Sequence, residues 1–103
     1  MVPLESRIKR KILKELRRDY PQGVWYKIHG GPHQIRGIPD IIGCLAGRFI
    51  AFEIKRPDDK YRPPTPYQLK EILAIKKASG VVAVVTGYDE IKVILTKFFP
   101  KTP

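Results

Sequence analysis

Three charged residues, Asp40, Glu53 and Lys55, lie in or beside apolar segments and are the hardest in this chain to explain by packing. Glu53 and Lys55 are two residues apart in a segment of strand-like alternation, so their side chains share one face. The segments on either side of Ala46-Gly47 predict a hairpin, and its register places Asp40 opposite Glu53. The pattern therefore brings two carboxylates side by side, with a lysine along the same strand.

Two adjacent carboxylates repel each other unless a positive charge lies between them. Mg²⁺ prefers carboxylate and water oxygens as ligands, and it polarises a phosphoryl group and lowers the pKa of bound water. Lys55 would then orient or deprotonate the attacking water, which indicates hydrolysis of phosphodiesters. The alternative is a surface hairpin with a cross-strand ion pair, since a Pro-Asp and Glu-x-Lys string arises by chance in roughly a few per cent of such chains.

Two further polar residues, Glu5 and Gln68, lie on predicted helices. Glu5 falls near the middle of the apolar stripe of the first helix, almost aligned with Ile12. A carboxylate that faces inward needs a partner or a metal, although at a helix start it also complements the dipole. Gln68 follows Thr65-Pro66-Tyr67, a pattern that fits a capping box and by itself requires no function.

Hydrophobic periodicity and turn signals predict the elements that position these residues. Helices are expected over 4–19, 66–79 and 89–98, and strands over 24–28, 40–45, 48–55 and 81–86. The last strand is expected to be fully buried, because it is an almost continuous run of valines. The order α-β-β-β-α-β-α predicts an α/β fold with a mixed β-sheet flanked by helices.

Net charge, cysteine content and apolar stretches limit the kinds of partner and compartment that we expect. The 103 residues carry a net charge of +10, which favours a polyanionic partner such as nucleic acid over a basic domain without one. Cys44 is the only cysteine, so an internal disulfide is excluded, and its apolar surroundings predict core packing. No apolar stretch is long enough for a membrane span and the N-terminus lacks a signal-peptide pattern, so we expect a cytoplasmic protein.

Four motifs together resemble a known family. Gly37-Ile38-Pro39-Asp40, Phe52-Glu53-Ile54-Lys55 and Thr65-Pro66-Tyr67-Gln68, preceded by Glu5 on the N-terminal helix, resemble the VRR-NUC nucleases of the PD-(D/E)xK superfamily. The similarity covers nearly the whole chain, from Glu5 to the strand over 81–86. Each motif is weak by itself, and their combination is specific.

The resemblance implies a restriction-endonuclease-like core, a single nuclease domain over 1–103 and dependence on Mg²⁺ or Mn²⁺, with no small-molecule cofactor. It implies that Asp40, Glu53 and the backbone carbonyl of Ile54 bind the metal. Glu5 would reach the metal through water, Lys55 would activate or position the attacking water, and Gln68 would belong to the site. Short stand-alone members are viral or bacterial and tend to form homodimers, whereas larger members carry the module in multidomain DNA repair nucleases. We therefore expect a homodimer in a bacterial or phage-infected cell.

Basic residues on both sides of the predicted site are candidates for DNA contacts. They are Lys27, His33, Arg36, Arg56, Lys60 and Arg62, each of which is equally well explained as a solvated surface residue. The Gly30-Gly31 loop would let a phosphate approach closely, Tyr61 would stack on an unpaired base, and Phe98 and Phe99 are apolar candidates for a dimer surface.

The sequence thus predicts a metal-dependent DNA endonuclease, selective for branched or junction DNA. A basic DNA-binding module that keeps the fold without cleavage is the alternative. An archaeal-type junction resolvase shares the superfamily core, but Gln68 after a Thr-Pro helix start favours VRR-NUC. A restriction endonuclease is disfavoured, because the short chain has no recognisable base-reading element.

Overall fold

The computed structural model describes residues 3–30, 35–59 and 62–100. Its elements are α1 (Leu4–Asp19), β1 (Val24–Lys27), β2 (Ile41–Leu45), β3 (Arg48–Ile54), the short 3₁₀ turn η1 (Pro57–Asp59), α2 (Pro66–Lys77), β4 (Val81–Val85) and α3 (Tyr88–Phe98). Apart from η1, the order of the elements is the predicted one, and the boundaries differ by one or two residues. The predicted α/β class is therefore confirmed.

The four strands form one mixed sheet in the order β1-β2-β3-β4. β1 and β2 are antiparallel, as are β2 and β3, whereas β3 and β4 are parallel and connected through α2. The β2–β3 turn has positive φ angles at Ala46 (52°) and Gly47 (78°), as in the two-residue turns that match the twist of a hairpin. The register runs from Leu45 opposite Arg48 to Ile41 opposite Phe52, so the next pair outward is Asp40 and Glu53.

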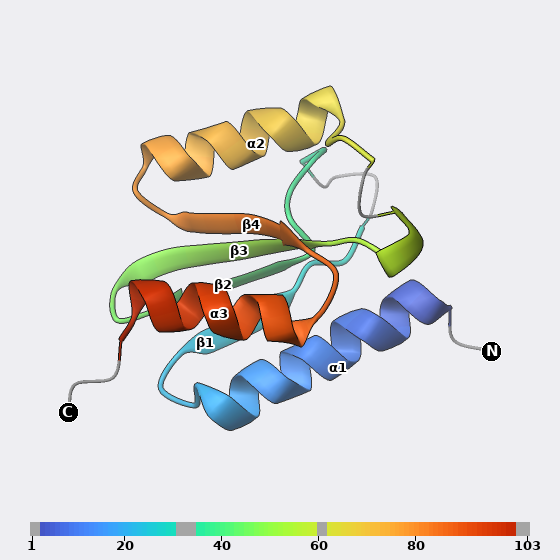
Figure 1. Cartoon of the computed structure of the whole chain (residues 1–103). Coiled ribbons are helices and arrows are strands. Elements are labelled where there is room, and N and C mark those ends of the chain that lie inside the picture. Colours follow the sequence, from blue (N-terminus) through green and yellow to red (C-terminus); the bar gives the residue numbers. More distant parts are fainter. Residues whose placement is uncertain (1–2, 31–34, 60–61, 101–103) are drawn as a thin grey trace.

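Helices cover both faces of this sheet (Figure 1), with α1 and α3 on one face and α2 on the other. The apolar stripe of α1 explains its position, because Ile12 and Leu16 join a core with Ile50 and Phe52 of β3 and Leu95 of α3. Within the described ranges, no helix is long and apolar enough to cross a membrane.

Two burial predictions were wrong, one because β4 lies at the edge of the sheet and the other because α2 packs on β4 and leaves part of its face of the sheet open. β4 is an edge strand in which Val84 is 37% exposed, so it is not fully buried. Cys44 is exposed on β2, in register with the equally exposed Val24 and Phe49. An apolar run therefore does not guarantee burial when the covering helix lies over the other half of the sheet.

Candidate active site

Asp40 is held immediately before β2 by three elements. Its backbone carbonyl accepts a hydrogen bond from the Ile28 amide (2.8 Å), and its side-chain Oδ2 accepts one from the Ile54 amide (2.7 Å). The preceding loop packs against the start of α2 at Gly37, where φ is +85° and an added Cβ would lie 2.2 Å from the Tyr67 carbonyl oxygen. The glycine of the Gly-Ile-Pro-Asp motif is therefore required for this close approach.

Glu53 is the one buried charged residue of the described chain, with 7% of its surface exposed. Burial raises the pKa of Glu53 to about 8, with further contributions from its hydrogen bond to Asp40 and from the Asp40 charge. The positive charges of Lys55 and Lys9 lower this pKa. The predicted cross-strand pair thus exists as two interacting carboxyl groups, of which Glu53 is buried.

Gln68 makes the capping contacts that its sequence pattern predicts, and it also contacts Glu53. Its backbone amide donates to Thr65 Oγ1 (3.2 Å), and its side-chain Oε1 accepts from the Thr65 amide (2.9 Å), which completes a capping box at the start of α2. Its Nε2 donates to Glu53 Oε2. The two roles are compatible because a carboxamide has an acceptor end and a donor end.

Asp40, Glu53 and Gln68 open onto a cavity of about 190 Å³. Its lining residues are Glu5, Lys9, Asp40, Glu53, Ile54, Lys55, Arg56, Asp59, Arg62 and Gln68. The cavity therefore brings together the five residues predicted as catalytic and the backbone position predicted as a metal ligand.

The inward orientation predicted for Glu5 was wrong, because Glu5 is exposed at the rim of this cavity. Leu4 is 42% exposed, and the contact of α1 with the core begins one turn later, at Ile8. The described residues contain no group of three or more Asp, Glu, His or Cys side chains arranged to hold a metal. Glu5 is therefore a rim residue and does not form an acidic triad with Asp40 and Glu53.

Lys9 is the residue of the site that the sequence analysis missed. Its Nζ lies 3.0 Å from Asp40 Oδ1. Helical periodicity places Lys9 outside the apolar stripe of α1, although it follows Glu5 by four residues and so shares its side of the helix. The four-residue spacing between Glu5 and Lys9 was the signal in the sequence that could have placed Lys9 near the site.

The oxygen atoms at the end of the cavity suit a hard divalent cation. Asp40 and Glu53 supply carboxylates, and Ile54 supplies a backbone carbonyl, which together are the ligand types that Mg²⁺ and Mn²⁺ take. The raised pKa of Glu53 agrees with such a fit, because a bound cation favours the charged form of a carboxyl group that is buried beside another.

The predicted DNA-contact residues separate into three groups. Arg56 and Arg62 line the cavity. Arg36 is exposed and donates to the Tyr67 hydroxyl (3.3 Å), whereas Lys27 ends β1, on the sheet edge opposite β4, and does not line the cavity. The predicted residues His33 and Lys60, and the loop positions Gly31 and Tyr61, lie outside the described residues.

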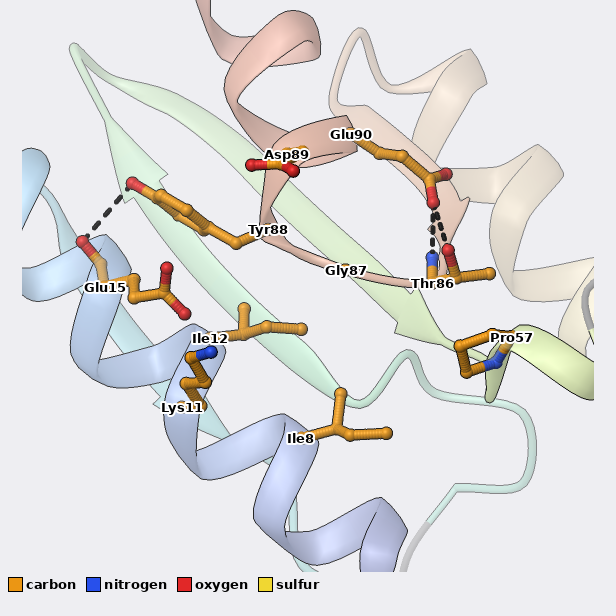
Figure 2. Close-up of a pocket in the computed structure, with 10 residues that line it drawn as sticks. All are labelled: Ile8, Lys11, Ile12, Glu15, Pro57, Thr86, Gly87, Tyr88, Asp89 and Glu90. Atoms are coloured by element: carbon orange, nitrogen blue, oxygen red, sulfur yellow. Dashed lines mark hydrogen bonds between the residues drawn. The ribbon is translucent and has the colours of Figure 1, made fainter.

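A larger hollow, of about 430 Å³, lies between α1 and the start of α3. Figure 2 shows hydrogen bonds between some of its lining residues: Glu90 accepts from the amide and hydroxyl of Thr86, and the Tyr88 hydroxyl donates to the Glu15 carbonyl oxygen at 3.3 Å. These contacts attach α3 to β4 and to α1, so the hollow is explained by packing.

Similarity to solved structures agrees with the geometry of the site. A structure described as a VRR_NUC domain superposes with a TM-score of 0.65 at 26% identity, covering 92% of this chain and 96% of that one. A Holliday junction resolvase from the archaeal hyperthermophile Archaeoglobus fulgidus superposes with a TM-score of 0.56 at 19% identity, covering 79% and 67%. No family model and no curated protein matches the sequence. The chain therefore has the restriction-endonuclease-like fold seen in VRR-NUC domains.

Proposed function

We propose that this chain is a Mg²⁺- or Mn²⁺-dependent DNA endonuclease that hydrolyses phosphodiester bonds and selects branched or junction DNA. The observation that carries the proposal is the pairing of Asp40 with the buried Glu53, which opens with Lys55 onto a cavity between basic residues. The structural similarity to a VRR_NUC domain and to a junction resolvase supports a nuclease.

Each residue of the site has a role in this proposal. Asp40, Glu53 and the Ile54 carbonyl would hold the metal, which would supply an acidified water and charge stabilisation at the phosphoryl group. Lys55 would position the attacking water through its ammonium group. Gln68 fixes the orientation of Glu53 from α2, and Glu5 contributes from the rim through water.

The basic residues that line the cavity would determine how DNA is held. Arg56 and Arg62 line the cavity, and the chain as a whole carries a net charge of +10, so contacts to phosphate dominate. Contacts of this kind position a backbone without identifying bases, so selectivity for shape is expected and selectivity for sequence is not.

A homodimer is part of the proposal, because two copies would present two sites to one branched substrate. Of the two candidate phenylalanines, Phe98 is 41% exposed and lies beneath the Arg48 guanidinium, whereas Phe99 packs against the core. Phe98 is therefore the better candidate for a surface between copies.

The test is cleavage of end-labelled four-way junction, flap and linear duplex DNA with Mg²⁺, with Mn²⁺ and with EDTA. We expect cleavage with either metal, none with EDTA, and faster cutting of branched DNA than of linear duplex. Glu53→Gln keeps the size and the acceptor of the side chain and should abolish cleavage. Equal cutting of linear duplex would disprove the selectivity, and equal cutting in EDTA would disprove the metal dependence.

The alternative, a basic DNA-binding module without cleavage, is supported by the net charge alone. The complete set of Asp40, Glu53 and Lys55 around one cavity argues against it. A Lys55→Ala variant separates the two functions, because it should bind a junction and fail to cut it. A variant that binds and cuts like the parent would remove Lys55 from the catalytic assignment.

A further inference from the structure

Both carboxylate oxygens of Asp40 already have partners within the protein. Oδ2 accepts from the Ile54 amide at 2.7 Å, and Oδ1 lies 3.0 Å from Lys9 Nζ. The side chains of Lys9 and Asp40 are only 20% and 21% exposed, so solvent screens the ion pair weakly. The amide is fixed in the β3 backbone, whereas the ammonium ends a flexible side chain and is the partner that can leave.

The fold holds Lys9 at this position. α1 is anchored to the core by Ile8, Ile12 and Leu16, and Lys9 lies on the flank of that stripe that borders the cavity. Other basic residues of α1, such as Lys14, are exposed on its outer surface. Lys9 is therefore the cation that α1 directs at the acidic pair.

We propose that Lys9 is a resident counterion of Asp40, which exchanges it for the divalent cation. The inference rests on the proposed function, because it takes Asp40 as a metal ligand. An ammonium and a metal ion at one carboxylate oxygen would repel each other, so Lys9 must leave Oδ1 before a cation binds there. Lys9 thus stabilises the metal-free protein and raises the metal concentration that the site requires.

The direct test is a Mn²⁺ titration of the full chain by calorimetry, without DNA. Lys9→Met keeps the apolar stem and removes the charge, and it should bind Mn²⁺ about three- to tenfold more tightly, the range expected from removing one partly screened competing charge. Lys9→Arg keeps the charge and should bind like the parent. Lys14→Met removes the same charge from the exposed side of α1, so it controls for the lower net charge and should stay within about twofold of the parent.

Thermal unfolding in EDTA supplies a second readout. Lys9→Met should unfold at a lower temperature than the parent when metal is absent, because Asp40 loses its counterion. It should also gain more stability than the parent when Mn²⁺ is added. A lysine with a merely structural role would lower both the stability and the metal affinity, so the opposite signs identify the exchange.

The outcomes separate this inference from the proposed function. If the parent binds Mn²⁺, Asp40→Asn abolishes that binding, and Lys9→Met binds no more tightly than the parent, the counterion role is wrong and the metal site stands. If Lys9→Met loses cleavage with unchanged Mn²⁺ affinity, Lys9 acts on the substrate and the inference is overturned. If the parent neither binds Mn²⁺ through Asp40 nor cleaves DNA, the proposed function fails and the inference fails with it.

Discussion

Two of the hollows that border α1 differ in size and in the surroundings of the nearby carboxyl groups. The larger of these, between α1 and α3, is about 430 Å³, and its wall residue Tyr88 donates a hydrogen bond to Asp19 (2.8 Å), which lies at the end of α1 and outside the hollow. Hydrogen bonds from Arg18 and Tyr88 hold the pKa of Asp19 well below its usual range. The smaller, at the ends of β2 and β3, is about 190 Å³ and contains Glu53, whose pKa is raised to about 8.

The burial of Glu53 beside Asp40 favours the smaller hollow as the site of chemistry. A carboxylate surrounded by donors is stabilised in its charged form and serves the packing of its helix. A carboxyl group that is buried against another lacks a cation, and such groups concentrate at functional sites. The volume of a hollow is therefore a poor guide here, and the supply of donors to its acidic groups is the better one.

The largest expected difference between the hollows is in cleavage. Glu53→Gln should lower the cleavage rate by about 10³-fold or more, within the range for removing a group that acts directly in the chemical step. Glu90→Gln, the matched change in the larger hollow, should leave the rate within about twofold, because Glu90 bonds only to Thr86. Single-turnover cleavage of a junction substrate measures both.

A comparable loss in Glu90→Gln, with its unfolding midpoint unchanged, would contradict the assignment of the larger hollow to packing.

The pH dependence of stability is the second prediction. Because the pKa of Glu53 is raised in the folded protein, the folded state holds a proton between about pH 4.5 and 8 that the unfolded chain releases. The metal-free protein should therefore lose stability as pH rises through this window, by at most about 1.4 kcal/mol per pH unit, the value for one proton. Urea unfolding in EDTA from pH 5 to 8 measures the slope, and Glu53→Gln should flatten it. An unchanged slope in that variant would assign the proton to another group.

Gln68 both caps α2 and contacts Glu53, so its substitution should lower cleavage by an intermediate amount. Gln68→Ala removes a cap interaction and the donor to Glu53, and it should cost about 1–2 kcal/mol of stability and lower cleavage by at least about tenfold. Thr65→Ala removes the cap and leaves Glu53 untouched, so it should cost about 1 kcal/mol with cleavage little changed. Urea unfolding and junction cleavage separate the two roles, and equal loss of cleavage in both variants would reduce Gln68 to a cap.

The smallest effect is expected for Tyr88→Phe. Burial and the hydrogen bond to Asp19 raise the pKa of Tyr88, which is therefore a neutral donor at working pH. Loss of its hydroxyl should cost about 1 kcal/mol of unfolding free energy. Cleavage should match the parent, and a clear loss would mean that the α1–α3 contact also controls the site.

The local patterns in the sequence predicted a large part of this structure. A two-residue turn at Ala46-Gly47 sets the hairpin register, and the register alone places Asp40 opposite Glu53. The two-residue period of a strand puts Lys55 beside Glu53. These relations are local, so no knowledge of the remaining fold was needed to derive them.

The errors concern contacts between distant elements. The exposure of Cys44 depends on which half of the sheet α2 covers, and the exposure of Glu5 depends on how far the first turn of α1 extends beyond the core. Helical periodicity gives the direction of a side chain relative to its neighbours on the helix, and it does not say where the helix meets the sheet.

Asp40, Glu53 and Lys55 as a group were thus determined by the sequence alone, because strand period and turn geometry act over a few residues. Only the tertiary structure decided that Lys9 reaches Asp40 across 31 positions of chain and that Gln68 turns its amide to Glu53. It also decided that Glu53 is buried deeply enough for its pKa to rise, since that depends on helices covering both faces of one strand.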